Sequence, residues 1–143
     1  MVIAVGAPIL ASDIGGPWAP YTPTLTNVTV GNGAITARYK RIDKTVFFQT
    51  HFLFGSTSAV TGSVTVGLPV APRLVTSVSA SVFFLDNLVG WFPGSWAPSG
   101  SGVVIRATNT SGTYATASAL SSTVPFTWTT DDYFNVSGFY EAV

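Results

Sequence analysis

The chain has 143 residues, of which 47% are hydrophobic and only 8% are charged, and its six basic residues balance its six acidic ones. This length suits one domain that buries its own core, and the zero net charge provides no attraction for nucleic acid or for an anionic membrane surface. The chain contains no cysteine, which excludes disulfide bonds, thiolate metal sites and cysteine nucleophiles.

The first segment, residues 1–22, differs from the rest of the chain because it is rich in proline. Pro8, Pro17 and Pro20 interrupt any regular strand, so we predict an extended arm that lies on the domain or on a neighbouring subunit. No basic residue precedes the apolar start, so no signal peptide is expected. No stretch approaches the roughly 18 consecutive apolar residues of a membrane-spanning helix. Residues 23–143 are expected to form the domain.

Beyond the arm, short runs of Val, Ile, Thr and aromatic residues alternate with Gly, Pro, Asn and Ser, which predicts an all-β protein. Turns are expected at 31–33 and at 109–112, so successive strands should pair as antiparallel neighbours. With no helix to cover a sheet, we predict an antiparallel, jelly-roll-like β-sandwich of about eight to ten strands. The predicted strands are 24–30, 34–41, 45–54, 63–68, 74–85, 88–92, 102–107, 113–120, 124–129 and 133–142.

Residues 36–54 hold four of the six basic residues and the only histidine. Side chains alternate along a strand, which predicts one core face, made of Val46, Phe48, Thr50, Phe52 and Phe54. The other face, Phe47, Gln49, His51 and Leu53, is expected to meet solvent or another subunit. No second ligand accompanies His51, so no metal site is predicted. The basic residues are interpreted as charges on an edge strand or an interface. The candidate interface residues are Trp18, Tyr21, Arg38, Lys40, Arg41 and His51.

Residues 90–102 combine Gly, Pro and Ser with two tryptophans and are predicted to form one long loop. The rings of Trp91 and Trp96, like those of Trp18 and Tyr21, suit either stacking on the apolar face of a sugar or packing in a subunit interface. Packing or an interface is favoured, because tryptophan is enriched at interface hot spots.

The sequence lacks the motifs of the common catalytic sites, such as a nucleophile elbow, a zinc-protease helix or a phosphate-binding loop. The adjacent acids Asp131 and Asp132 would point to opposite faces of a strand, so they cannot flank a glycosidic bond together, and we interpret them as solvated. We therefore predict a protein that is not an enzyme and needs no cofactor.

Four motifs follow one another along the chain, and their order is more specific than any one of them: WAPYTPTLT at 18–26, GNG at 31–33, TARYKRIDKTV at 36–46 and LPV at 68–70. Over residues 10–75 this order resembles a β-domain that recurs in bacteriophage virion proteins, commonly at the C-terminal ends of minor tail and tail-fibre proteins. The resemblance implies a homotrimer without catalytic residues that is located in the virion, with the major capsid protein or tail proteins as partners.

Because this domain would make up nearly the whole chain, we favour a capsid decoration protein. The alternative is a tail-fibre or minor tail module that binds host cell-surface carbohydrate through Trp91 and Trp96. Neither nucleic acid nor a membrane is an expected partner. Deleting residues 1–17 should leave a folded domain that attaches more weakly to the particle.

Overall fold

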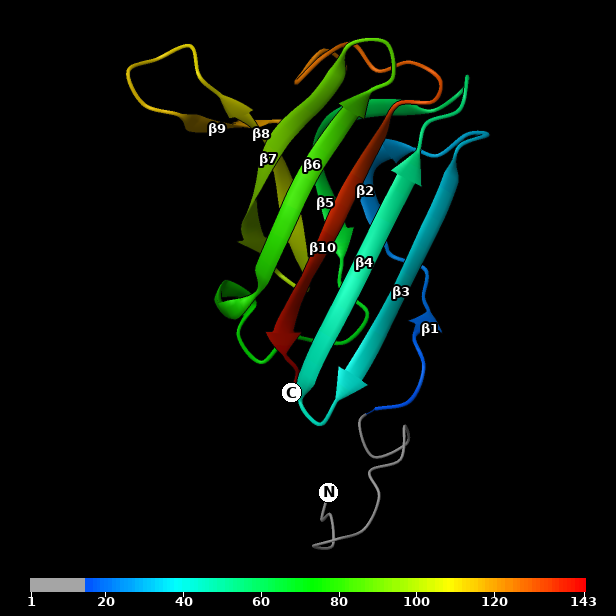
Figure 1. Cartoon of the computed structure of the whole chain (residues 1–143), viewed down its shortest axis with the longest axis vertical. Coiled ribbons are helices and arrows are strands. Elements are labelled where there is room, and N and C mark those ends of the chain that lie inside the picture. The colour runs from blue at the N-terminus through cyan, green and yellow to red at the C-terminus, as the bar shows by residue number, and fades with distance from the viewer. Residues whose placement is uncertain (1–14) are drawn as a thin grey trace, which may run out of the picture.

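The structure, a computed structural model, describes residues 15–143 (Figure 1). Its regular elements are ten strands and one short 3-10 helix. They are β1 (Ala19–Pro20), β2 (Leu25–Thr29), β3 (Ala34–Ile42), β4 (Thr45–Leu53), β5 (Ala59–Gly67), η2 (Val75–Ser77), β6 (Ser79–Asp86), β7 (Gly90–Ser99), β8 (Gly102–Asn109), β9 (Thr116–Ala119) and β10 (Tyr133–Glu141). The one predicted strand that is missing is 124–129, of which Phe126 and Trp128 instead pack on the core from an irregular segment.

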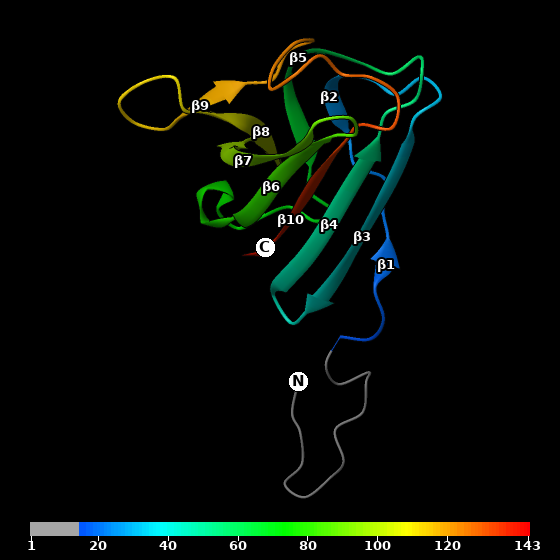
Figure 2. The ribbon, with the colours of Figure 1, turned by 45° about the horizontal axis from the view of Figure 1, so that its top comes forward.

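All strand pairs are antiparallel, in the order β1-β3-β4-β10-β6-β7-β8-β5-β2, with β9 added on β8. The sheet curls, so that β3, β4, β10 and β6 form one layer and β2, β5 and β8 form a second layer behind it (Figures 1 and 2). The prediction of an all-β, antiparallel, sandwich-like fold with eight to ten strands is confirmed. The two layers are the two halves of one curled sheet.

The core lies between the layers and is built by alternation along the strands. In β4 the predicted core positions Val46, Phe48, Thr50 and Phe52 are all buried, and so is Phe54 just after the strand. The rings of Phe52 and Phe134 lie 5.3 Å apart across the β4–β10 pair. Burying an aromatic ring of this kind stabilises a domain by about 2 to 3 kcal/mol, so these positions dominate the stability of the fold. We call this side of the strands the inner face.

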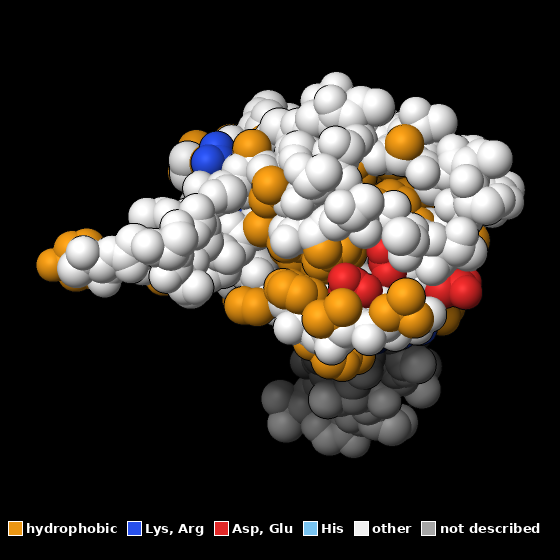
Figure 3. Space-filling view, turned by 90° about the horizontal axis from the view of Figure 1, so that it is seen from above, with side chains coloured by type: hydrophobic (Ala, Val, Ile, Leu, Met, Phe, Trp, Pro, Cys, Tyr) orange, Lys and Arg blue, Asp and Glu red, His pale blue; other side chains and the backbone are white. Residues whose placement is uncertain are grey.

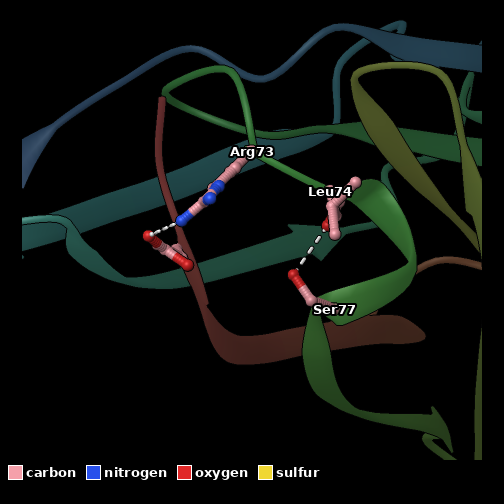
Figure 4. Close-up of polar contacts among 4 residues, drawn as sticks. Arg73, Leu74 and Ser77 are labelled. Carbon is pink, nitrogen blue, oxygen red and sulfur yellow. Dashed lines mark hydrogen bonds and ion pairs between the residues drawn. The ribbon is translucent and has the colours of Figure 1, made fainter.

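The C-terminal strand β10 occupies the middle of the front layer, between β4 and β6 (Figure 1). Its inner positions Phe134, Val136 and Tyr140 are buried. The Tyr140 hydroxyl donates to the Val70 carbonyl oxygen at 2.7 Å and accepts from the Val70 N–H at 3.1 Å. At the end of β10, Arg73 forms an ion pair of 2.9 Å with Glu141. In the adjacent turn the Ser77 hydroxyl donates a hydrogen bond to the Leu74 carbonyl oxygen (Figure 4).

The prediction of a long loop over residues 90–102 is wrong, because most of this segment forms β7. The prolines misled the prediction, since proline interrupts the ladder of a central strand. Here β7 pairs with β6 over its first half and with β8 over its second half. Pro93 is paired only with Phe83, and Pro98 only with Val103. Each proline therefore has one unpaired side, where its missing N–H breaks no ladder.

The turn at residues 31–33 exists, but the predicted hairpin between its flanking strands is wrong. β2 pairs with β5 and β3 pairs with β4, so the turn carries the chain from one layer to the other. Gly31 supplies the positive φ of 55°. Asn32 fixes the corner, because its Oδ1 accepts from the Thr57 N–H at 2.9 Å and its Nδ2 donates to Ser56 Oγ at 3.0 Å. The predicted turn at 109–112 does join two paired strands, β8 and β9.

Of the predicted arm, residues 1–14 lie outside the described residues. The remainder runs along β3 and includes the short edge strand β1, where Ala19 pairs with Tyr39 and Pro20 with Arg38. Gly15 lies at the end of β3, and a Cβ there would come within 2.2 Å of the Arg41 carbonyl oxygen. The described chain therefore begins at the end of the sheet.

Candidate interaction face

The most distinctive surface is the outer face, which we define as the side of β3, β4, β10, β6 and β7 opposite the core. On the three central strands, the outer face consists of the odd-numbered residues in 47–53 of β4, 133–139 of β10 and 79–85 of β6. None of these positions carries Asp, Glu, Lys or Arg. The outer face of a sheet in contact with water normally carries polar and charged residues, so the uncharged part of this face on β4, β10 and β6 is unusual.

An exposed aromatic pair stands at one end of the outer face. Phe47 and Phe139 are direct cross-strand partners, with ring centroids 6.0 Å apart. Their side chains are 36% and 50% exposed, although the adjacent core positions Phe48 and Tyr140 are buried. The core is therefore complete without this pair, and the two rings face outward.

Trp18 adds a third ring at the edge of the outer face. It lies over Arg38, whose guanidinium carbon is 5.0 Å from the ring centroid, and it is 39% exposed. Arg38 in turn donates from Nε to Gln49 Oε1 at 2.9 Å. This cation–π contact and hydrogen bond hold the indole against the sheet.

Between these rings runs a shallow groove of about 410 Å³. It crosses from the edge of β3 over β4 and β10 to β6. Aromatic rings stand along it, and serine hydroxyls, the Gln49 amide and exposed backbone form its floor. Gly138 has no room for a side chain, because a Cβ would come within 2.0 Å of the Ser79 carbonyl oxygen. The lining residues are Trp18, Phe47, Phe48, Gln49, Ser79, Ala80, Ser81, Ser137, Gly138 and Phe139.

At the other end of the outer face lies an aromatic patch, formed by His51, Tyr133, Phe83 and Trp91. The His51 and Tyr133 ring centroids are 4.6 Å apart, those of Tyr133 and Phe83 6.3 Å, and those of Phe83 and Trp91 5.2 Å. Trp91 is the most open of them, at 64% exposure. Desolvation lowers the pKa of His51 below its usual 6.5, so the imidazole tends to stay neutral and the patch uncharged near pH 7.

Beyond this patch, the turn between β6 and β7 carries Leu88 and Val89, both largely exposed. Viewed from this end, hydrophobic side chains lie next to acidic ones (Figure 3). The β8–β9 hairpin projects to one side in the same view, away from the outer face, and carries the exposed Tyr114.

Four of the six predicted interface residues share one face of the sheet, although His51 lies in the aromatic patch, apart from Trp18. Trp18, Arg38, Lys40 and His51 all lie on the outer face. Arg41 pairs with the buried Val46 and lies on the opposite side of β3, where its Nε donates to the Asp43 carbonyl oxygen at 2.7 Å.

Tyr21 also points away from the outer face. Its hydroxyl lies 2.7 Å from Thr50 Oγ1, and its ring meets Tyr39 edge to face at 5.9 Å. Burial raises the pKa of Tyr21 above its usual 10.0. This contact anchors the start of the described chain to the core.

The two tryptophans proposed for sugar stacking do not share a face. Trp91 lies on the outer face opposite Leu85, whereas Trp96 pairs with the buried Ile105 and packs against the core. The four rings considered for a stacking platform, Trp18, Tyr21, Trp91 and Trp96, are therefore not brought together.

The interpretation of Asp132 as a solvated acid is wrong, because its side chain is fully buried. Its Oδ1 accepts from the Asn87 N–H at 2.9 Å, and its Oδ2 accepts from the Thr129 N–H at 2.5 Å and from Thr129 Oγ1 at 3.1 Å. The carboxylate thus ties the 87–89 turn to the start of β10, directly beside the aromatic patch. Asp131 is exposed, as predicted.

Sequence reasoning did not single out Phe139 or Phe83, which complete the groove and the aromatic patch. Their signal was available in the alternation of β10 and β6, where each lies between two inner positions. The described residues contain no cluster of three or more His, Asp or Glu side chains placed to hold a metal ion. Within residues 15–143 there is also no helix of the length and apolarity that a membrane crossing needs.

Comparison of the chain with protein-family models, with curated proteins and with solved structures found no match.

Proposed function

We propose that this protein is a non-enzymatic structural protein of a bacteriophage virion, a homotrimer that decorates the capsid and makes its contacts through the outer face and the N-terminal arm. The class and the trimer follow from the motif order over residues 10–75, which resembles virion β-domains. The outer face supports a role in assembly.

The observation that carries the proposal is the uncharged, aromatic outer face of β4, β10 and β6. The exposed Phe47–Phe139 pair, with Trp18 beside it, offers a contiguous apolar surface that the core does not require. Such patches on soluble proteins mark interaction sites, and aromatic residues supply most of the affinity at hot spots. A chain with only 8% charged residues also has few charges to keep copies apart.

The test is the mass in solution, measured by sedimentation equilibrium over a wide concentration range. The natural chain should approach three times 14.9 kDa. A full-length F47S/F139S double variant should dissociate at concentrations where the natural chain remains assembled. Tyr114→Ser provides the matched control, because Tyr114 is an exposed aromatic residue on the β8–β9 hairpin. A monomeric natural chain at all concentrations, or a double variant that assembles as well as the natural chain, contradicts the proposal.

The number of copies per purified particle separates the capsid from the tail. A decoration protein is present in hundreds of copies, and a tail component in a handful. Copy number therefore tests the location independently of the trimer.

A second candidate function, recognition of host carbohydrate by a tail protein, is favoured by the aromatic patch. Trp91 presents its ring to solvent beside Phe83 and Tyr133, the arrangement on which a sugar face stacks. Loss of host-polysaccharide binding in Trp91→Ala, with the oligomer intact, would support this role. Trp96→Ala is the wrong probe, since Trp96 packs on the core.

A further inference from the structure

We propose that the apolar segment 1–10 of one copy binds in the groove beside Trp18, Phe47 and Phe139 of an adjacent copy. This proposal depends on the assembly role proposed above, because a monomer has no neighbouring groove.

The dimensions of the groove suit an extended peptide. It crosses from the edge of β3 to β6, which is three strand spacings, or about 14 Å at about 4.8 Å per spacing. An extended chain advances about 3.3 Å per residue, so four or five residues span that distance. The groove is open at its surface, so a peptide can lie along it without entering a closed cavity.

The chemistry of the groove also suits such a segment. Phe47, Phe139 and Trp18 offer ring faces to apolar side chains. The hydroxyls of Ser81 and Ser137, on the floor, can pair with the N–H and C=O groups of a bound backbone. No Asp, Glu, Lys or Arg lines the groove, which favours an uncharged occupant.

The sequence of residues 1–10, MVIAVGAPIL, has this character. Every residue in it is apolar or glycine, and the first charged side chain in the sequence is that of Asp13. At this composition the segment gains by leaving water, and Trp18 in the groove lining is three residues from Gly15, where the described chain begins.

The direction of the chain assigns the segment to a neighbour. From Trp18, in the groove lining, the described chain runs back along β3 to Gly15, which lies against the Arg41 carbonyl oxygen at the end of that strand. The described chain therefore leaves its own groove and reaches the end of its own sheet at Gly15 (Figure 1). A segment that starts there is presented to whatever adjoins that end, which in an oligomer is another copy.

Disulfide trapping tests this assignment, and the natural chain is a clean background because it has no cysteine. Full-length Ala4→Cys chains are mixed with full-length Ser137→Cys chains that carry a size tag, and the mixture is oxidised mildly. We expect a covalent heterodimer in at least fivefold excess over the heterodimer formed when Ser122→Cys replaces Ser137→Cys. Ser122 is an exposed serine outside the groove, so it measures random collision.

The outcomes separate the arm from the assembly itself. If light scattering shows an oligomer but the Ser137 and Ser122 yields are equal, the arm proposal fails and the assembly role stands. If the natural chain is monomeric at every concentration, the assembly role fails as well. If a chain carrying both A4C and S137C closes on itself at high dilution and no mixed dimer forms, the segment occupies its own groove, and the proposal is overturned.

A second full-length variant measures the contribution of the segment to association. Ile3→Asp places a charge among the apolar residues and should weaken association about tenfold or more. Asp13→Asn, in the same part of the chain, should leave association unchanged. An Ile3→Asp chain that associates as tightly as the natural one overturns the proposal.

Discussion

Replacing Asp132 should destabilise the protein more than replacing any other acidic residue that the structure describes. Its buried carboxylate accepts three hydrogen bonds, from the backbone N–H groups of Asn87 and Thr129 and from the Thr129 hydroxyl. Asp132→Ala leaves these donors without a partner, and each buried unsatisfied group costs about 1 to 3 kcal/mol. We therefore expect the free energy of unfolding to fall by about 3 to 5 kcal/mol. Asp132→Asn keeps one acceptor oxygen and should lose about half as much.

Urea unfolding followed by tryptophan fluorescence measures this change, at one fixed protein concentration because association also stabilises the folded state. Trp128 is a suitable reporter, since its ring packs against the core and stacks on Phe54 at a centroid distance of 4.6 Å. Asp131→Asn is the control, because Asp131 is exposed and asparagine tolerates its positive φ of 69°. A loss below about 1 kcal/mol for Asp132→Ala, or equal losses for both neighbours, would refute this account of the buried carboxylate.

Three further changes test the packing of the sheet. Tyr140→Phe should cost about 1 to 2 kcal/mol because it removes both hydrogen bonds to Val70. Burial raises the pKa of Tyr140 to about 12, so its share of the stability is present below pH 10 and falls as the pH rises from 10 towards 12; unfolding midpoints should show this fall diminished in Tyr140→Phe. Gly138→Ala should lower the free energy of unfolding by about 2 kcal/mol or more, because the new Cβ would collide with the Ser79 backbone. An unchanged unfolding midpoint would contradict the close spacing of β6 and β10 at this position. Because the pKa of His51 is lowered in the folded chain, the imidazole is protonated in the unfolded chain at a higher pH than in the folded one. The free energy of unfolding should therefore fall as the pH drops below 6.5, and His51→Gln should lessen that fall between pH 7.5 and 5.

The local pattern of the sheet could be predicted because side chains alternate strictly along a strand. In β4 the alternation assigned Val46, Phe48 and Phe52 to the core, and all three are buried. The order of the strands could not be predicted, since it depends on pairings between distant segments. β10 lies between β4 and β6, and no local signal in residues 133–141 indicates those partners.

The groove on the outer face could not be predicted from the sequence for the same reason. The groove joins residues of β4, β6 and β10 with Trp18 beside β1, and only the strand order brings Trp18 near Phe139. The interpretation of Trp91 and Trp96 as one stacking pair depends on the predicted loop over residues 90–102, most of which is a strand. Once β7 is known to be a strand, Trp91 and Trp96, five positions apart, must point to opposite faces.

The two sides of β4 and β10 separate stability from assembly. Phe48 and Tyr140 are buried on the inner face and hold the layers together, whereas their neighbours Phe47 and Phe139 touch each other on the outer face. An exposed aromatic pair contributes only about 0.5 to 1.5 kcal/mol to folding, much less than a buried ring. The F47S/F139S variant should therefore have nearly the same free energy of unfolding as the natural chain when both are monomeric. It should nevertheless fail to associate. Loss of both properties together would mean that the pair belongs to the core, and the outer face would lose its role as a docking surface.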